Sequence, residues 1–123
     1  MSETFIPSLC ARIADAADRK IPLRIRGGGS KDFYGASPAG DACDVASYAG
    51  IVAYEPKELV LTVRAGTPLA DIERALAAER QMLPFEPMDH RALYGSEGDP
   101  TIGAIAACNI SGPRRINAGA ARD

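Results

Sequence analysis

The run Arg26-Gly27-Gly28-Gly29-Ser30-Lys31 constrains this chain more than any other stretch. It continues a short apolar and basic segment, Leu23 to Arg26, which predicts a strand that leads straight into a loop. Glycine lacks a Cβ, so the backbone can take positive φ and approach a ligand closely, and successive N–H groups turned to one side bind an anion. Ser30 and Lys31 add a hydroxyl and an ammonium. The pattern predicts either a phosphate-binding loop at 27–31 or a glycine-rich surface connection between two strands.

Two well-known phosphate loops do not fit this spacing. The Walker loop needs Gly, four residues and then Gly-Lys-Ser/Thr, whereas the Rossmann fingerprint needs Gly-x-Gly-x-x-Gly at the start of a helix. Residues 32–40 after the glycines contain turn-forming residues and show no helical period. A phosphate would therefore be held by loop amides, without a helix dipole directly behind them.

Composition and length exclude several functional classes. The 123 residues suit one domain or one lobe of a larger domain. A net charge of −2 and 6% aromatic residues without tryptophan make nucleic acid an unlikely partner, because neither a basic field nor stacking platforms are available. The sequence has no basic and apolar leader and no apolar run long enough for a membrane span, so neither a signal peptide nor a transmembrane segment is expected.

The cysteines point to a reducing compartment. Cys10, Cys43 and Cys108 are odd in number, far apart and in no CxxC spacing, so neither a disulfide framework nor a zinc site is indicated. Apolar residues recur with a helical period over about Ser8 to Arg19, which predicts a helix with Cys10 on its buried stripe and Arg12 on the opposite face.

The middle of the chain predicts a hairpin followed by a helix. Cys43 to Val45 is a possible short strand, and the apolar runs Ile51 to Tyr54 and Leu59 to Arg64 flank a polar, proline-containing break that reads as a hairpin. Thr67 is expected to cap a helix that starts at Pro68 and continues to about Arg80. The buried stripe of this helix is expected to consist of Leu69, Ile72 and Leu76.

A second informative stretch comes late in the chain. Thr101 can cap a short helix whose next residues are mostly small, including Gly103, Ala104, Ala106 and Ala107. Small residues serve either tight helix packing or the close approach of an anionic or planar cofactor. Together with the glycine loop, the second interpretation is favoured. The polar insert Met88 to Asp99 has no metal-ligand spacing, and its His90, the only histidine, is expected to be a solvated loop residue.

These residues together carry a resemblance to a known family. The glycine loop, Gly66-Thr67-Pro68-Leu69, Met82-Leu83-Pro84-Phe85-Glu86-Pro87 and Ser111-Gly112-Pro113-Arg114-Arg115 occur in the same order in the amino-terminal part of the FAD-binding subunits of bacterial glycolate oxidases. Those subunits are vanillyl-alcohol-oxidase-like, PCMH-type flavoproteins. The resemblance implies an α+β fold, with residues 1–123 as the amino-terminal lobe of a PCMH-type FAD-binding domain that has a small mixed sheet and flanking helices.

The resemblance also implies a cofactor site. It places the FAD pyrophosphate at the glycine loop and the rest of the dinucleotide along the later segments, with these cofactor-binding residues: Arg26, Gly27, Gly28, Gly29, Ser30, Lys31, Pro84, Glu86, Pro87, Thr101, Ile102, Gly103, Ala106 and Asn109. Family members with covalent flavin often attach it through a His in or beside this loop, where Ser30 stands here. Non-covalent FAD is therefore expected, with Cys108 as the one credible attachment point.

The functional expectation is an FAD-binding component of an oxidoreductase that oxidises a small 2-hydroxy acid such as glycolate. It would act with a sister flavin subunit and an iron-sulfur subunit, in the cytoplasm or bound through these partners to the inner face of the membrane. The alternatives are a non-catalytic FAD-binding or assembly subunit of the same complex and, third, a flavin-free structural lobe. The chain stops at Arg122-Asp123, where such proteins continue, so a fragment without an assignable catalytic base is expected.

Overall fold

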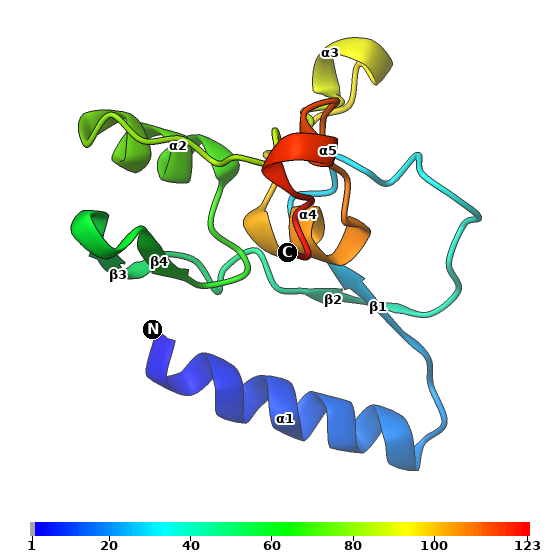
Figure 1. Ribbon diagram of the computed structural model, residues 1–123. Helices are drawn as coiled ribbons and strands as arrows, with labels where there is room; N and C mark the ends of the chain where they lie inside the picture. Colours follow the sequence, from blue (N-terminus) through cyan, green and yellow to red (C-terminus); the bar gives the residue numbers. More distant parts are fainter. Residues whose placement is uncertain (1) are drawn as a thin grey trace.

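The structure, a computed structural model, describes residues 2–123 as short strands between helices. Figure 1 shows α1 on one side of the strands and α2 and α4 on the other. In chain order the elements are α1 (Ser2–Asp18), β1 (Leu23–Arg26), β2 (Asp41–Asp44), β3 (Ile51–Glu55), a 3-10 turn (Pro56–Glu58), β4 (Val60–Val63), α2 (Leu69–Ala78), α3 (Arg91–Tyr94), α4 (Ile102–Cys108) and α5 (Arg115–Ala118).

The strands form two separate sheets instead of the one mixed sheet that was expected. β1 and β2 pair in parallel, with Leu23 opposite Asp41, and β3 and β4 pair antiparallel. A parallel pair needs a connection that returns to the same end, and residues 27–40, which include the glycine loop, supply it. The loop therefore leaves the carboxyl end of β1 without an intervening helix, as the sequence predicted.

The predicted hairpin is confirmed. Its turn is the 3-10 segment that begins at Pro56, and Leu59 closes it in the left-handed region with φ 57°. Tyr54 and Gln81 connect the hairpin to the end of α2, because the Tyr54 hydroxyl donates to Gln81 Oε1 at 2.6 Å and Gln81 Nε2 donates to the Pro56 carbonyl at 2.8 Å. Desolvation by burial, with a smaller effect from Glu79, raises the pKa of the Tyr54 hydroxyl.

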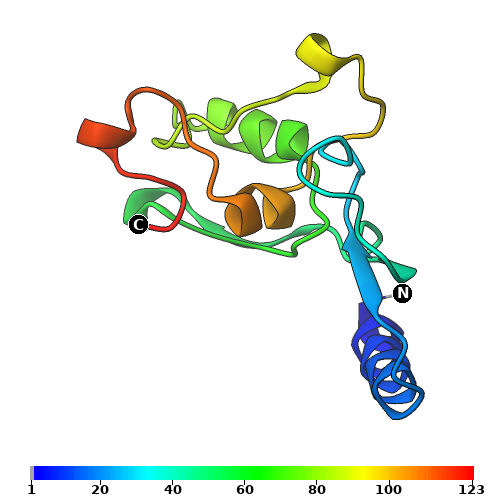
Figure 2. The same ribbon diagram turned by 90° about the vertical axis from the view of Figure 1, so that its right-hand side faces the viewer.

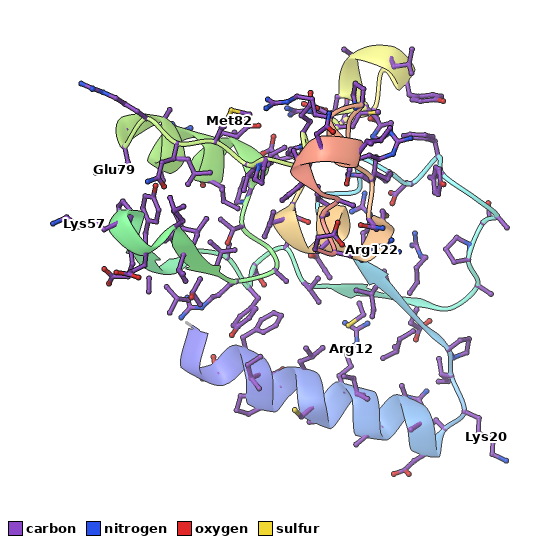
Figure 3. The ribbon with its side chains drawn as sticks, in the orientation of Figure 1. Arg12, Lys20, Lys57, Glu79, Met82 and Arg122 are labelled. Carbon is purple, nitrogen blue, oxygen red and sulfur yellow. The ribbon has the colours of Figure 1, made fainter. Side chains whose placement is uncertain are left out.

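Helix α1 begins earlier than predicted and turns a different face inward. The face toward the strands consists of half-buried Phe5 and Leu9, Arg12 and buried Ala16, which recur at helical spacing. The Phe5 ring stacks on Tyr48 with 5.0 Å between centroids, and the Arg12 guanidinium donates to the Ala42 carbonyl of β2. Figure 3 shows Arg12 pointing from α1 toward the strands.

The assignment of Cys10 to the core was therefore wrong. Cys10 is exposed, as are Ile6 and Ile13, because they lie about a hundred degrees around the helix from the inward face. Arg12, predicted on the solvent face, in fact faces β2. The apolar periodicity located the helix, but it could not show which of two adjacent faces is buried, because residues on both faces recur every three or four positions.

Helix α2 buries the predicted stripe but starts differently at its amino terminus. Leu69, Ile72 and Leu76 are buried. Thr67 does not cap the helix, because the N-cap residue is Pro68 and no side chain caps it. The buried Thr67 hydroxyl instead donates to the Arg64 carbonyl at 2.6 Å and accepts from the Gly50 N–H at 3.0 Å. It holds the hairpin to the start of the helix.

Helix α4 packs beside α2, and Figure 2 shows both above the β3–β4 hairpin. Ile105 of α4 is fully buried, and Leu69 of α2 donates its N–H to the Pro100 carbonyl just before α4. Thr101 is the N-cap residue, as predicted, but its side chain makes no capping hydrogen bond. Among residues 2–123, no helix is both long and apolar enough to cross a membrane.

Candidate cofactor-binding site

One cavity of about 460 Å³ lies where β1, the glycine loop and α4 meet. Ligand pockets commonly have volumes of roughly 300 to 1,000 Å³. The structure brings together here eight of the sequence-predicted site residues: Arg26, Gly27, Gly28, Gly29, Ser30, Lys31, Thr101 and Gly103. The two stretches that the sequence singled out for close approach to a cofactor therefore line a single cavity.

The glycine loop presents unused hydrogen-bond donors. Within the described part of the chain, the backbone N–H groups of residues 27–31 donate to no backbone acceptor, whereas that of Asp32 donates to the Gly29 carbonyl. Lys31 lines the cavity, and its Nζ is buried without a partner. A run of free amides beside an unpaired ammonium is suited to binding an anion.

Gly27 and Gly28 are also required by the protein's own packing, and Gly29 is required by its backbone conformation. A Cβ on Gly28 would lie 1.7 Å from the Asp99 carbonyl oxygen, and one on Gly27 would lie 2.6 Å from the Thr101 hydroxyl. Gly29 has φ +78°, and a Cβ there would meet the Arg26 guanidinium. The missing side chains in this loop thus first allow the loop backbone to pack against the segment at the start of α4, before any ligand is considered.

Arg26 is fixed at the mouth of the loop. Its Nε donates to Asp32 Oδ2 at 3.1 Å, and the guanidinium lies over Gly29. Both side chains are partly exposed, so the pair contributes little to stability. The contact orients the positive charge of Arg26 along the loop.

Residues 88–99, called the insert below, lie against the glycine loop. The Ser96 hydroxyl donates to the Ser30 carbonyl at 3.1 Å. Arg91 holds the two ends of the insert together, because its guanidinium binds Asp89 at 2.7 Å and Asp99 at 2.9 Å. The hydrogen bonds from Arg91 lower the pKa of the Asp89 carboxyl, with a smaller contribution from the charge of Lys31.

His90 lies in a loop, as expected, but it is not fully solvated. The His90 ring is half-buried, 5.6 Å from the Phe33 ring and 6.4 Å from the Tyr94 ring, and its Nδ1 is buried without a partner. Phe33 and Tyr94 stack with 3.9 Å between their centroids. The polar composition of the insert concealed these aromatic contacts, because they join segments far apart in sequence.

Six of the sequence-predicted residues lie outside the cavity lining: Pro84, Glu86, Pro87, Ile102, Ala106 and Asn109. The Glu86 carboxylate accepts from the Arg114 N–H at 2.8 Å and thereby anchors the turn before α5. Asn109 ends α4 with φ 49°, and its side-chain oxygen accepts from the Arg122 N–H at 3.1 Å. These contacts position the carboxyl-terminal segment. A cofactor-binding role for the six residues remains a prediction.

Sequence reasoning missed several residues of the lining. Val45, Ala65 and Tyr34 line the cavity without having been singled out, whereas Ala104 and Cys108 belong to the small-residue stretch that the sequence did single out. Ala65 packs so closely on α4 that a Cβ at Gly103 would lie 2.8 Å from its carbonyl oxygen. The small residues of Ala65-Gly66 and of Gly103 were the sequence signal available for this contact, but only the tertiary structure shows that the two stretches meet.

The cysteines differ in accessibility. Cys43 is buried in β2, whereas Cys108 is exposed at the end of α4 and lines the cavity. No group of three or more His, Cys, Asp or Glu side chains among the described residues has the geometry of a metal site.

The loop, the cavity and the unpaired ammonium are suited to a phosphate-containing ligand, and comparison with known proteins shows the family. Residues 6–123 match the FAD binding domain family, and the chain belongs to that family. It is 45% identical over 116 residues to the protein named "Glycolate oxidase subunit GlcE" from Escherichia coli (strain K12). The match covers 94% of this chain and 31% of the relative. The chain thus spans about a third of the length of the curated relative it matches. No solved structure matched significantly.

Proposed function

We propose that the protein is the FAD-binding component of an oxidoreductase that oxidises a small 2-hydroxy acid such as glycolate. The observation that carries the proposal is the convergence of the glycine loop and α4 on one cavity, whose lining includes Lys31 with a buried, unpaired Nζ, in a member of the FAD binding domain family. The similarity to a glycolate oxidase subunit supplies the substrate class.

In this proposal each part of the site has a defined role. The amides of residues 27–31 and Lys31 hold the pyrophosphate of FAD, while Arg26 adds positive charge at the mouth. Thr101 and Gly103 let α4 lie close to the dinucleotide. Bound FAD supplies the chemistry, namely acceptance of the hydride of the 2-hydroxy acid. Residues 1–123 act as the amino-terminal part of the FAD-binding domain.

The proposal extends to partners and location. A sister flavin subunit and an iron-sulfur subunit would complete the assembly, in the cytoplasm or at the inner face of the membrane. The second candidate is a non-catalytic FAD-binding or assembly subunit of the same complex. It is kept as a candidate because the cavity lining contains no histidine and a single carboxylate, that of Asp32, which is paired with Arg26.

The test uses the full-length subunit, purified without its partners. Mass spectrometry of the extracted ligand should find FAD, and NAD or no flavin after reconstitution would overturn the central claim. Anaerobic addition of glycolate then separates the two candidates. Prompt bleaching of the flavin supports catalysis by this subunit, whereas bleaching only after the partners are added supports the second candidate.

We further propose that FAD is held without a covalent bond. Attachment needs a nucleophile held within bonding distance of the ring, and the glycine loop has neither His nor Cys. Acid precipitation of the full-length holoprotein should leave yellow flavin in the supernatant. Flavin fluorescence that stays with the denatured chain, and disappears in Cys108→Ala, would instead identify Cys108 as the attachment point.

A further inference from the structure

The cavity beside the glycine loop is lined by one carboxylate, that of Asp32, and by three cationic side chains: Arg24, Arg26 and Lys31. A negative charge opposes the binding of an anion, because like charges repel each other. The presence of Asp32 in a site suited to phosphate therefore calls for an explanation. Its contacts supply one, since the carboxylate binds Arg26 and no other side chain in the described part of the chain.

Asp32 holds one edge of the Arg26 guanidinium. Its Oδ2 accepts a hydrogen bond from Arg26 Nε at 3.1 Å. The backbone sets the position of this carboxylate, because the Asp32 N–H donates to the Gly29 carbonyl at 3.2 Å and closes a turn at the end of the glycine run. The segment that forms the anion-binding loop thus also supplies the acceptor for Arg26.

The guanidinium of Arg26 lies against the backbone of the loop. A Cβ at Gly29 would lie 2.7 Å from Arg26 Cζ, so the missing side chain leaves room for the guanidinium. Among residues 2–123, neither Nη1 nor Nη2 of Arg26 has a hydrogen-bond partner. Because Nε is occupied, the free edge is the one formed by the two terminal nitrogens, and a planar fork of this kind matches two oxygens of a phosphate.

We propose that Asp32 is a positioning residue for the cofactor, which orders Arg26 so that Nη1 and Nη2 bind two oxygens of the FAD pyrophosphate. This inference rests on the proposed function, because it takes FAD as the ligand. It deepens that proposal, in which Arg26 only adds positive charge at the mouth of the loop. An arginine that is ordered before binding holds the ligand more tightly, since the ligand does not have to restrict its rotamers.

The experiment compares Asp32→Ala with Asp32→Asn in the full-length protein. Alanine removes the acceptor, whereas the amide oxygen of asparagine can still accept from Arg26 Nε. Asp41→Ala is the matched control, because Asp41 is an exposed residue outside the cavity lining and its loss changes the net charge equally. Quenching of flavin fluorescence during reconstitution gives the dissociation constant of FAD for each protein.

Asp32→Ala should weaken FAD binding about three- to tenfold, the loss expected when the ligand itself must order a long side chain. Asp32→Asn should stay within about twofold of the wild type, since it keeps an acceptor. Asp41→Ala should leave the dissociation constant unchanged. Simple repulsion predicts the opposite sign for Asp32→Ala, because removing a negative charge from an anion site strengthens binding. The sign of the change thus distinguishes positioning from repulsion.

Two further readouts would not respond to a merely structural role of Asp32. In an Arg26→Met background, the additional change Asp32→Ala should no longer weaken FAD binding, because the side chain that Asp32 orders is gone. The second readout is the NMR signal of the Arg26 Nε proton, recorded without FAD. This proton should exchange slowly with water in the wild type and in Asp32→Asn, and rapidly in Asp32→Ala.

The outcomes separate this inference from the proposed function. If the wild type holds no FAD, the proposed function fails. If the wild type holds FAD and Asp32→Ala binds it equally or more tightly, Asp32 acts only as an opposing charge and the inference is overturned. Equal losses in Asp32→Ala and Asp32→Asn overturn it as well, and so does a loss from Asp32→Ala that persists in Arg26→Met. Circular dichroism confirms that all variants fold.

Discussion

At the scale of single residues, Gly28 makes the most sharply defined contact in the site. Its backbone lies directly against that of Asp99, and a Cβ would overlap the Asp99 carbonyl oxygen. The absence of a side chain at this position brings the insert onto the loop. Gly28 therefore matters for the arrangement of the site even before any ligand is considered.

We expect Gly28→Val to weaken FAD binding by at least tenfold in the full-length protein. A branched side chain must push Asp99 and the insert away, and forced overpacking typically costs about 1 to 3 kcal/mol. Gly35→Asn is the matched control in the same connection, because nothing lies within 4 Å of a Cβ there and asparagine tolerates its positive φ. Fluorescence titration measures both, and unchanged affinity in Gly28→Val would show that the loop is a mere connection.

Thr67 is the second residue whose role follows from its hydroxyl. Thr67→Val keeps the shape of the side chain but leaves the Gly50 N–H without its acceptor, in a position only 1% exposed. The expected loss is about 1 to 3 kcal/mol in the free energy of unfolding, measured by urea denaturation. Thr67→Ser keeps both hydrogen bonds and should lose less. A larger loss in Thr67→Ser than in Thr67→Val would show that the methyl group, not the hydroxyl, matters.

At the scale of elements, the insert is held in place by Arg91. The guanidinium joins Asp89 to Asp99, while Ser96 and the Phe33–Tyr94 stack attach the insert to the loop. Short helix α3 has too few residues to be stable alone, so these contacts determine its position.

The Arg91–Asp89 pair predicts a specific pH dependence. Hydrogen bonds from Arg91 lower the pKa of Asp89 in the folded protein. The stability that this ionised carboxyl contributes is therefore complete at neutral pH and is lost as the pH falls through the folded-state pKa. In Arg91→Gln, the Asp89 carboxyl should titrate at a higher pH than in the wild type. Carboxyl-carbon NMR follows the titration, and an unchanged Asp89 pKa would contradict the ion pair.

At the scale of the whole molecule, α1 and the β3–β4 hairpin are among the elements that leave apolar side chains exposed. Ile6 and Ile13 of α1 are 43% and 50% exposed, and Val52 and Val60 of the hairpin are 60% and 53% exposed. The cavity is lined by β1, the glycine loop and α4, with few residues from elsewhere. The relative that this chain matches is about three times longer.

We therefore expect residues 1–123 alone to bind FAD much more weakly than the full-length protein. Each hydrogen bond from a charged group contributes about 1.5 to 3 kcal/mol, and a few must offset an association cost of roughly 4 kcal/mol or more. Isothermal titration calorimetry of the two proteins side by side measures the difference, with circular dichroism as the control for folding. Submicromolar binding by residues 1–123 would show that this part already forms a complete site.

The sequence by itself determined much of the local structure and indicated the class of site. Strand β1, the hairpin and the buried stripe of α2 followed from apolar periodicity and turn residues, since these depend on neighbours in sequence. The glycine run and Lys31 predicted an anion-binding loop because of what glycine backbone and an ammonium can do in any fold. The order of these motifs also indicated the family to which the chain belongs.

Only the tertiary structure decided which surfaces meet. It selected the face of α1 that contains Phe5 over the face that contains Cys10, and it used the Thr67 hydroxyl to join two elements instead of capping a helix. It also placed the insert on the glycine loop, with His90 half-buried against Phe33. Such contacts join residues far apart in sequence and are set by packing and by the pairing of buried polar groups, neither of which leaves a periodic signal in the chain.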